Sequence, residues 1–214
     1  MIGSNKYFEN FKKAVSVPLP EMAEYFEAEN RYLACIAGSN KRALDVGCGP
    51  GRVMEFIAPL VQEVVGIDYN SRMVALAAER LKDVPNVQLV EEDIFNFQPP
   101  RLFDLVFASY NLPGSCDIAP SRRQKLLIKL LSLARSGGDC VVSFWKPTSP
   151  DWLEEYYQSL GAEILTAQGN IVTTTMGEFT RFSDEDIADL VCDLNVEHTV
   201  VHLTPMFDLV HFRP

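Results

Sequence analysis

The chain has 214 residues, of which 47% are hydrophobic and 22% charged, and it contains 13 Phe. This composition is typical of a folded soluble protein and excludes a disordered chain, and the length suits one domain with a single large core. The formal net charge of −10 repels phosphate backbones and so argues against a nucleic acid partner.

Two amphipathic helices are predicted before the first strand, over residues 5–17 and 21–37, with Pro18 and Pro20 between them. Their aromatic residues either pad a sheet or fold over a ligand as a lid. We treat residues 1–38 as an N-terminal helical cap.

Strands then alternate with helices. We expect strands at 43–46, 64–68, 87–90, 103–108 and 140–145, and helices at 52–60, 71–81, 121–135 and 151–160. Asn70 or Ser71 and Ser121 are the expected helix caps, and Gly137-Gly138 is expected to turn the chain into the fifth strand. This alternation implies parallel pairing with right-handed crossovers, which is a doubly wound α/β sheet with helices on both faces.

After residue 147 the pattern changes. Segments 162–166 and 171–176 are rich in β-branched residues around Gln168-Gly169-Asn170 and predict a β-hairpin outside the main sheet. Ser183 caps a helix to about residue 194, and strands at 197–203 and 206–212 are forced antiparallel by their short connection. The fold expected is a mostly parallel seven-stranded sheet with an antiparallel last strand. It forms one domain, 1–214, with a core of 41–160 and 183–214 and an inserted cap hairpin at about 162–182.

Five scattered cysteines form no C-x-x-C pair, which suits a reducing cytosol and argues against a disulfide framework. Residues 1–11 lack a secretory apolar region, and no uncharged apolar run of about 18 residues occurs in the chain. We therefore expect a cytoplasmic protein with no membrane segment. Its oligomeric state, monomer or homodimer, stays open.

Residues 44–52, LDVGCGPGR, predict a strand that runs into a glycine-rich turn and then a helix. Such a turn permits positive φ and lets a ligand approach main-chain atoms. A dinucleotide fingerprint needs a glycine where Arg52 stands, and no phosphate loop follows any strand. Neither phosphate cofactor fits well.

Two later strands end in acids. Asp68 can accept both hydrogens of a ribose diol, as in any adenosine ligand. Asp93 follows the third strand, with the apolar Ile94 beside it, and this pair suits the amino edge and the face of an adenine. Asp93 can also be only a turn cap.

At this point the chain resembles the S-adenosylmethionine-dependent methyltransferases of the class I, seven-stranded Rossmann-like type, in motif order over residues 41–145. The resemblance implies that S-adenosyl-L-methionine is the cofactor and that Gly47, Gly49 and Gly51, with Cys48 between them, bring backbone against its methionine part. Asp45 would orient this loop. It further implies that Asp68 binds the ribose, that Tyr69 flanks the adenine with Asp93 and Ile94 at its edge and face, and that Ser109 lies near the methionine end.

The sequence says less about the methyl acceptor. In-line transfer from a sulfonium mainly needs the reactants to be aligned in a dry pocket, and it needs a base only where the nucleophile must lose a proton. The residues Tyr110 and Asn111 follow the fourth strand and are the candidate catalytic residues. Amino-group methyltransferases often carry Asn- or Asp-Pro-Pro-aromatic there, but Leu112 and Gly114 depart from that pattern. The candidates for substrate binding are Tyr7, Tyr25, Tyr110, Asn111 and Phe179.

No metal site is expected, because His198 and His202 on a strand would stand about 13 Å apart, at roughly 3.3 Å per residue. The basic residues Arg122, Arg123, Lys125 and Lys129 are interpreted as the solvated side of an apolar helix. The hypothesis is methyl transfer to an N or O atom of a small-molecule metabolite. The alternatives are a protein or nucleic acid methyltransferase, a non-catalytic partner subunit with the cofactor fold, and an NAD-dependent oxidoreductase.

Overall fold

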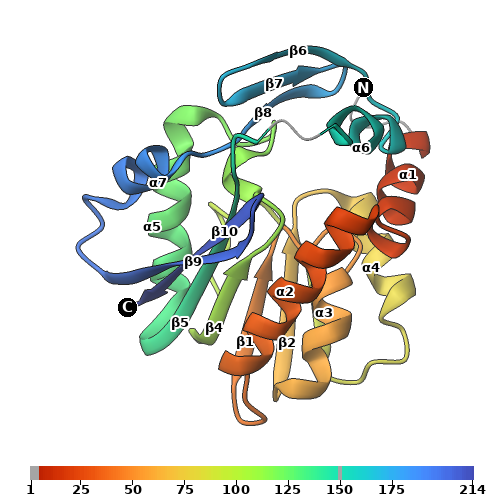
Figure 1. Ribbon diagram of the computed structural model, residues 1–214. Helices are drawn as coiled ribbons and strands as arrows, with labels where there is room; N and C mark the ends of the chain where they lie inside the picture. The colour runs from red at the N-terminus through yellow and green to blue at the C-terminus, as the bar shows by residue number, and fades with distance from the viewer. Residues whose placement is uncertain (1–4, 149–150) are drawn as a thin grey trace.

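The computed structural model describes residues 5–148 and 151–214, which form an α/β fold around one seven-stranded sheet (Figure 1). The strand order is β3-β2-β1-β4-β5-β10-β9. The strands are β1 Arg42–Val46, β2 Glu63–Asp68, β3 Val87–Glu91, β4 Phe103–Ala108, β5 Ala134–Trp145, β9 Glu197–Thr204 and β10 Phe207–Arg213. Strands β1 to β5 pair in parallel, while β10 is antiparallel to both β5 and β9. The predicted fold class is confirmed.

The strand order reverses at β1, which pairs with β2 on one side and β4 on the other. In open α/β sheets ligands bind outside the carboxyl ends of the strands at such a point. The middle strands are buried on both faces, which is why the sequence over 103–108 is a nearly continuous apolar run.

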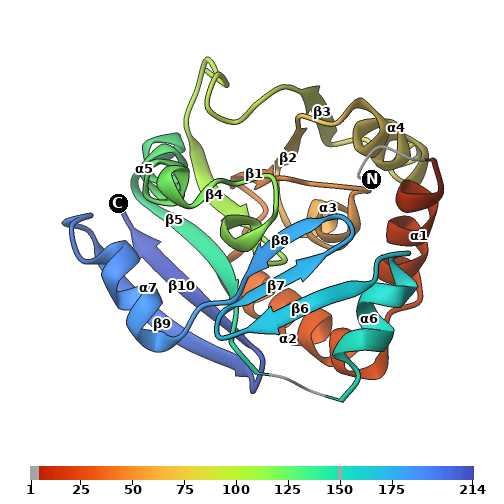
Figure 2. The same ribbon diagram turned by 90° about the horizontal axis from the view of Figure 1, so that it is seen from above.

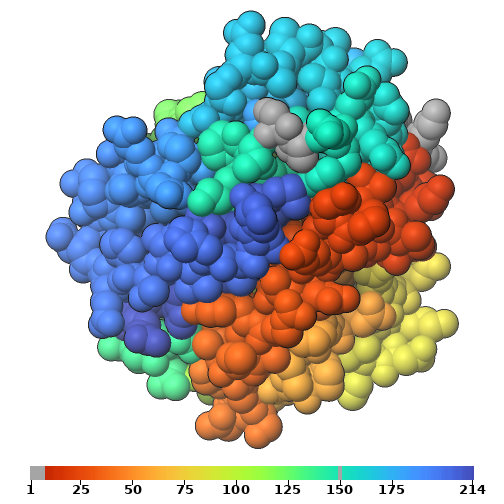
Figure 3. All heavy atoms as spheres, in the orientation of Figure 1, coloured from red at the N-terminus to blue at the C-terminus, as the bar shows by residue number. Residues whose placement is uncertain are grey.

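Helices cover both faces of the sheet. The helices are α1 Asn5–Ser16, α2 Pro20–Ile36, α3 Arg52–Ile57, α4 Ser71–Arg80, α5 Arg123–Leu133, α6 Leu153–Ser159 and α7 Asp184–Val191. Side chains of α2, α3 and α4 pack on one face in one hydrophobic cluster, and those of α5 and α7 pack on the other. The space-filling view shows α2, in orange, alongside the blue terminal strands on one surface of the molecule (Figure 3).

Two predicted helix starts are confirmed by their capping contacts. The Asn70 side chain accepts from the Arg72 N–H at 3.1 Å. Ser183 and Asp186 form a reciprocal capping box at the start of α7. Ser121 is not a cap, because it lies inside a 3₁₀ turn, Pro120–Arg122, and α5 begins only at Arg123 without a side-chain cap.

The predicted hairpin is a three-stranded antiparallel sheet. It consists of β6 Ile164–Gln168, β7 Ile171–Thr174 and β8 Gly177–Thr180, in that order. Residues 171–176 were predicted to form one strand, but β7 ends at Thr174. The chain turns within them because Thr174 Oγ1 accepts from the Met176 N–H and donates to the Gly177 carbonyl, and Gly177 takes a φ of +144°.

The fifth strand also begins earlier than predicted, at Ala134. Gly137 and Gly138 lie inside it at a bulge opposite Phe103–Leu105, so they do not form a turn before the strand. Gly137 has a φ of +71°, and a Cβ on Gly138 would lie 2.9 Å from the Asp104 carbonyl oxygen. These two positions therefore require glycine for the bulge itself.

Seen from above, α1, α6 and the three-stranded sheet stand over the carboxyl ends of the main strands (Figure 2). A third hydrophobic cluster joins them to the sheet through Trp145 and Phe207. We call these three parts, α1, α6 and β6–β8, the cap.

Candidate active site

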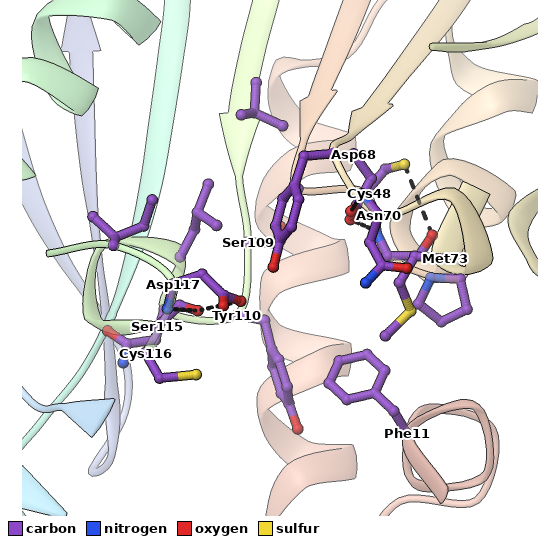
Figure 4. Close-up of a pocket in the computed structure, with 18 of the residues that line it drawn as sticks. Phe11, Cys48, Asp68, Asn70, Met73, Ser109, Tyr110, Ser115, Cys116 and Asp117 are labelled. Carbon is purple, nitrogen blue, oxygen red and sulfur yellow. Dashed lines mark hydrogen bonds between the residues drawn. The ribbon is translucent and has the colours of Figure 1, made fainter. Parts of the chain in front are cut away.

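A cavity of about 410 Å³ lies between the cap and the ends of the main strands. Nine of the ten residues expected to bind a cofactor line it: Asp45, Gly47, Cys48, Gly49, Asp68, Tyr69, Asp93, Ile94 and Ser109. In Figure 4, Cys48, Asp68 and Asn70 form one wall, Ser115, Cys116 and Asp117 face them, and Tyr110 and Phe11 lie side by side beyond.

The glycine-rich loop is fixed to the neighbouring strand. The N–H groups of Gly47 and Cys48 both donate to the Ile67 carbonyl, at 2.8 and 3.1 Å. Gly47 and Gly49 have φ values of +70° and +52°, and a Cβ on Gly47 would lie 3.0 Å from the Leu112 side chain. Both glycines line the cavity, so side chains here would be strained and would narrow it.

Gly51 has a different place. It is the residue before α3, with a φ of +80°, and it does not line the cavity. A Cβ there would lie 2.9 Å from Leu81 Cδ1 and 3.3 Å from Ala77 Cβ. The third glycine thus allows the loop to pack closely against α4.

Asp68, at the end of β2, holds the same loop. Its Oδ2 accepts from the Gly49 N–H at 3.0 Å and its Oδ1 from the Asn70 N–H at 2.9 Å. Burial raises the pKa of Asp68 above its ordinary value, and these two backbone bonds oppose the shift. Each oxygen has a second lone pair, which leaves the carboxylate able to accept hydrogen bonds from a ligand.

Asp45 and Arg52 carry buried polar atoms without partners. Asp45 Oδ2 and Arg52 Nη1 have no hydrogen-bond partner among the described residues, and both residues line the cavity. Burial raises the pKa of Asp45 well above its usual range, against the pull of Arg52. Arg52 Nη2 pairs with Glu29 Oε2 at 2.5 Å, and its guanidinium lies 3.9 Å from the centre of the Phe26 ring.

The residues expected around an adenine stand at the mouth of the cavity. Tyr69 is 54% exposed. Burial of its hydroxyl and the nearby Asp117 raise its pKa. Asp93 Oδ1 accepts from the Phe95 N–H at 2.9 Å, so this carboxylate does cap a turn, and its Oδ2 lies 3.9 Å from Arg122 Nη2.

The interpretation of the basic residues as a solvated helix side is wrong for Arg123 and Lys129, which are half-buried, and incomplete for Arg122, which is exposed but also lines the cavity. Lys129 Nζ donates to the Phe97 carbonyl at 2.6 Å. Arg122 lines the cavity and lies 3.9 Å from the centre of the Phe95 ring. Arg123 donates to the Pro113 carbonyl and to Thr180 Oγ1. Both precede or begin α5, where no amphipathic helix pattern could place them.

Three residues that line the cavity directly after Gly114 were not predicted from the sequence. Ser115, Cys116 and Asp117 line the cavity opposite Asp68 (Figure 4). Burial raises the pKa of Cys116 to about 12, with Asp117 adding to the shift, so this thiol stays protonated at neutral pH. Three small or polar residues after a strand end, before the next helix, were the available sequence pattern.

Tyr110 and Asn111 adopt a left-handed backbone, with φ values of 60° and 59°. Two such residues in succession without glycine are strained, and such strain clusters at functional sites. Tyr110 lines the cavity, and its hydroxyl lies 2.6 Å from that of Tyr156 in α6. Burial raises the pKa of Tyr110 to about 12.

The side chain of Asn111 bonds to main-chain atoms on two sides. Its Nδ2 donates to the Thr180 carbonyl at 2.9 Å, and its Oδ1 accepts from the Trp145 N–H at 3.1 Å. Asn111 is 5% exposed. Its amide thereby joins the turn after β4 to β5 and to the three-stranded sheet.

Tyr25 is fully buried and does not line the cavity. Its hydroxyl bonds to Glu29 and Ser143 and accepts from the Tyr110 N–H at 3.1 Å. It supports the strained turn from behind. Of the other substrate candidates, Phe179 lines the cavity, and the side chain of Tyr7 lies outside the part of the chain that the structure describes.

Over residues 5–148 and 151–214, no group of three or more His, Cys, Asp or Glu side chains could hold a metal ion. His202 Nδ1 instead lies 2.9 Å from Asp208 Oδ1, and His198 Nδ1 lies 3.1 Å from the Val196 carbonyl. Within the same ranges, no helix is long and apolar enough to cross a membrane.

The chain is similar to known methyltransferases. Residues 43–138 match the family described as "Methyltransferase domain". Trans-aconitate 2-methyltransferase of Escherichia coli O7:K1 is 35% identical over 51% of this chain and 40% of its own length. Malonyl-[acyl-carrier protein] O-methyltransferase 1 of Ilyobacter polytropus is 28% identical over 68% of this chain and 54% of its own length.

The match thus spans about half the length of these curated relatives or less. Among solved structures, the DhpI–SAH complex superposes with a TM-score of 0.69 at 20% identity, over 97% of this chain and 93% of that one. This likeness covers the whole fold, including the cap. Residues 43–138 are therefore similar to a methyltransferase domain, and the chain as a whole has the Rossmann-like α/β fold of the structures on which it superposes.

Proposed function

We propose that the protein transfers a methyl group from S-adenosylmethionine to an N or O atom of a small-molecule metabolite. The observation that carries this is the enclosure of one cavity by two kinds of wall. The glycine-rich loop and the strand-end acids form one wall, and the cap, made of segments far apart in the chain, forms the other. A cap of this kind suits a small acceptor better than a polymer.

The residues present fit the cofactor. Gly47 and Gly49 leave room for main-chain contact, and Asp68 stands where a ribose diol can donate to it. The unpartnered Asp45 Oδ2 and Arg52 Nη1 are opposite in character, as the ammonium and carboxylate of a methionine moiety require. Tyr69, Asp93 and Ile94 are proposed for the adenine, and Ser109 for the methionine end.

When bound, the cofactor supplies a methyl group on a sulfonium sulfur. The protein's part is to hold the acceptor in line with that methyl group and to exclude water. Tyr110 is placed for this, because it lies at the boundary between the two walls and bonds to Tyr156 of the cap. Asn111 then acts as a positioning residue, since its amide fixes the backbone that presents Tyr110.

The relatives support a small acceptor by their names. One acts on trans-aconitate and the other on malonyl groups of acyl-carrier protein, at oxygen. The acidic surface, with a formal net charge of −10, disfavours nucleic acid. We also propose that residues 1–214 form a single domain with an inserted cap at about 162–182. Of the N-terminal cap expected at 1–38, α1 lines the cavity, whereas α2 packs on a face of the sheet. The proposal places the protein in the cytoplasm, where its five free cysteines suit a reducing environment.

Isothermal titration with S-adenosylmethionine, S-adenosylhomocysteine and NADH tests the donor half. We expect both sulfur ligands to bind and NADH not to bind. Asp68→Ala should weaken S-adenosylhomocysteine binding about tenfold or more, since hydrogen bonds to a charged group contribute about 1.5–3 kcal/mol. Asp83→Ala, an exposed acid between α4 and β3, is the matched control and should bind as wild type does.

Mass spectrometry of cell extract incubated with the enzyme and labelled cofactor then tests the acceptor half. We expect a small molecule to gain one labelled methyl group. Label found only in protein would replace the proposal by protein methylation. Binding without any labelled product in extract would favour a non-catalytic subunit, and NADH binding alone would favour an oxidoreductase.

A further inference from the structure

Aromatic side chains make up much of the cap side of the cavity, beside the aliphatic Val15, Leu160 and Met176. Six of them come from α1, the turn after β4, the end of β5, α6 and β8, and they are Phe11, Tyr110, Trp145, Tyr156, Tyr157 and Phe179. An apolar acceptor explains one or two such rings. Six converging rings, on elements that the fold brings together only in this place, call for a more specific explanation.

The rings pack against one another and so form one continuous aromatic wall of the cavity. The centroids of Trp145 and Tyr156 lie 5.2 Å apart, and those of Tyr157 and Phe179 lie 5.5 Å apart. Trp145 and Tyr157 are 6.4 Å apart and almost parallel, with an interplanar angle of 7°. Ring faces carry partial negative charge, and a cation within about 6 Å of a ring centroid is attracted to it.

The charges around the cavity point the same way. Five carboxylates line it, against two guanidinium groups, those of Arg52 and Arg122. Arg52 is paired with Glu29, and Arg122 lies near Asp93 at the adenine end. Even with Asp45 counted as protonated, acids outnumber bases among the lining residues, and no charged lining residue, acidic or basic, comes from the cap.

A cation that interacts with Tyr157 from behind the rings is Arg181, which follows β8 and does not line the cavity. It is 2% exposed, and its two terminal nitrogens donate to the carbonyls of Thr148 and Gly169. An anionic acceptor placed on the cap side would therefore meet ring faces, and no basic group among the described lining residues comes from the cap. A carboxylate or phosphonate placed there would lose its hydration without replacement.

Resting on the proposed function, we infer that the acceptor is an amine, bound in its ammonium form among the ring faces of Trp145, Tyr156, Tyr157 and Phe179. The Tyr110 hydroxyl, beside them, gives an oxygen to which an ammonium N–H can donate. This sets the protein apart from its relatives that are named for acids and acyl groups.

The reaction balances with water as the proton acceptor. The bound ammonium loses one proton to water, and the freed nitrogen lone pair forms the new N–CH₃ bond. The C–S bond breaks, and its electron pair stays on sulfur. The products are a methylammonium ion and S-adenosylhomocysteine, with one proton released overall.

Three probes of the same shape test this. They are choline, its neutral isostere 3,3-dimethyl-1-butanol, and the anion 3,3-dimethylbutanoate, none of which needs to react. Each is titrated into the whole protein with and without S-adenosylhomocysteine. We expect choline to bind about tenfold more tightly than the alcohol, and the anion to bind most weakly.

Two variants of Tyr157 distinguish the loss of a ring face from a general loss of stability. Tyr157→Phe keeps the ring face and should keep the preference for choline, whereas Tyr157→Leu should lose most of it. Phe179→Leu should act like Tyr157→Leu, and Leu165→Ala, an exposed residue of β6, should act like wild type. A thermal melt of each variant checks that the fold is intact.

Equal binding of choline and the alcohol, or tighter binding of the anion, would overturn the inference. Because the probes are compared with and without S-adenosylhomocysteine, the cation preference is judged separately from cofactor binding. A protein that binds S-adenosylhomocysteine but shows no cation preference would retain the proposed function and lose this inference.

Discussion

Glu29 and Arg52 form a buried ion pair that gives a direct test of how the site is supported. Glu29 is 1% exposed and sits in α2, and its other oxygen bonds to the Tyr25 hydroxyl. Burial lowers the pKa of Arg52, but the charge of Glu29, its hydrogen bond to Arg52 and the nearby Tyr25 and Tyr110 together outweigh burial, and the pKa is raised. Glu29→Gln would leave Arg52 charged in an apolar setting against Phe26.

Breaking a buried pair by removing one partner costs about 3–5 kcal/mol, and we expect the lower end because Gln keeps the shape of Glu. For a chain of this length about 3 kcal/mol corresponds to a fall in Tm of roughly 6–12 °C. The measurement is urea denaturation followed by circular dichroism, with a thermal melt alongside. Glu27→Gln is the control, because its pair with Arg31 is exposed at 3.7 Å and should contribute less than about 0.5 kcal/mol.

The double variant Glu29→Gln/Arg52→Met sharpens the test. Removing the orphaned charge should restore part of the stability lost in Glu29→Gln, so the two effects should not add. If Glu29→Gln stays within 1 kcal/mol of wild type, or if the double variant loses the full sum of the single effects, the reasoning from a desolvated pair is refuted.

Three further predictions concern the loop and the cap. Arg181→Met should remove the bonds to two carbonyls and loosen the cap, which faster proteolysis near residues 148–170 would reveal; unchanged cleavage would contradict this. Gly51→Ala should destabilise the fold by about 1–2 kcal/mol more than Gly169→Ala does. Both glycines have positive φ, but only at Gly51 would the added Cβ approach a neighbour, Leu81 Cδ1, at 2.9 Å. Equal losses of unfolding free energy in urea would count against the packing role of Gly51. The pKa of Asp45 is raised in the folded state, so its contribution to stability is present below its unfolded pKa of about 4 and is lost as pH rises towards the folded pKa. Asp45→Asn should therefore reduce the fall of Tm with rising pH in a series of thermal melts. An unchanged slope would contradict the raised pKa.

The parallel sheet and the donor side could be predicted from the sequence because each depends on local pattern. Apolar runs, a glycine turn and acids at strand ends lie within a few residues of one another, and the sheet places them at one edge. The positions of nine predicted cofactor residues around one cavity follow from that rule. The packing role of Gly51 could not be predicted in this way. Its neighbours Ala77 and Leu81 lie well outside the local sequence pattern.

The cap could be predicted only as extra elements. Whether residues 171–176 form one strand or turn back depends on a side-chain bond of Thr174, which propensity does not register. The partners of Asn111 at positions 145 and 180, and those of Tyr25 at 29 and 143, are contacts between distant segments. Because the sequence does not show these contacts, Asn111 and Tyr25 were both predicted to bind substrate. In the structure their polar groups support the turn after β4, and Asn111 but not Tyr25 also lines the cavity.

The three-stranded sheet is held on the main sheet by the hydrophobic cluster around Trp145 and Phe207 and also by bonds to main-chain atoms. The Asn111 side chain donates to the carbonyl of Thr180, and the Phe182 N–H donates to the carbonyl of Trp145. A main-chain carbonyl is present whatever side chain a residue carries. Residues 164–180 can therefore diverge, or be exchanged for another insertion, without rebuilding the glycine-rich loop and the strand ends that line the other side of the cavity. The insertion is thus open to grafting, with Asn111 as the fixed point to which a new insertion must dock.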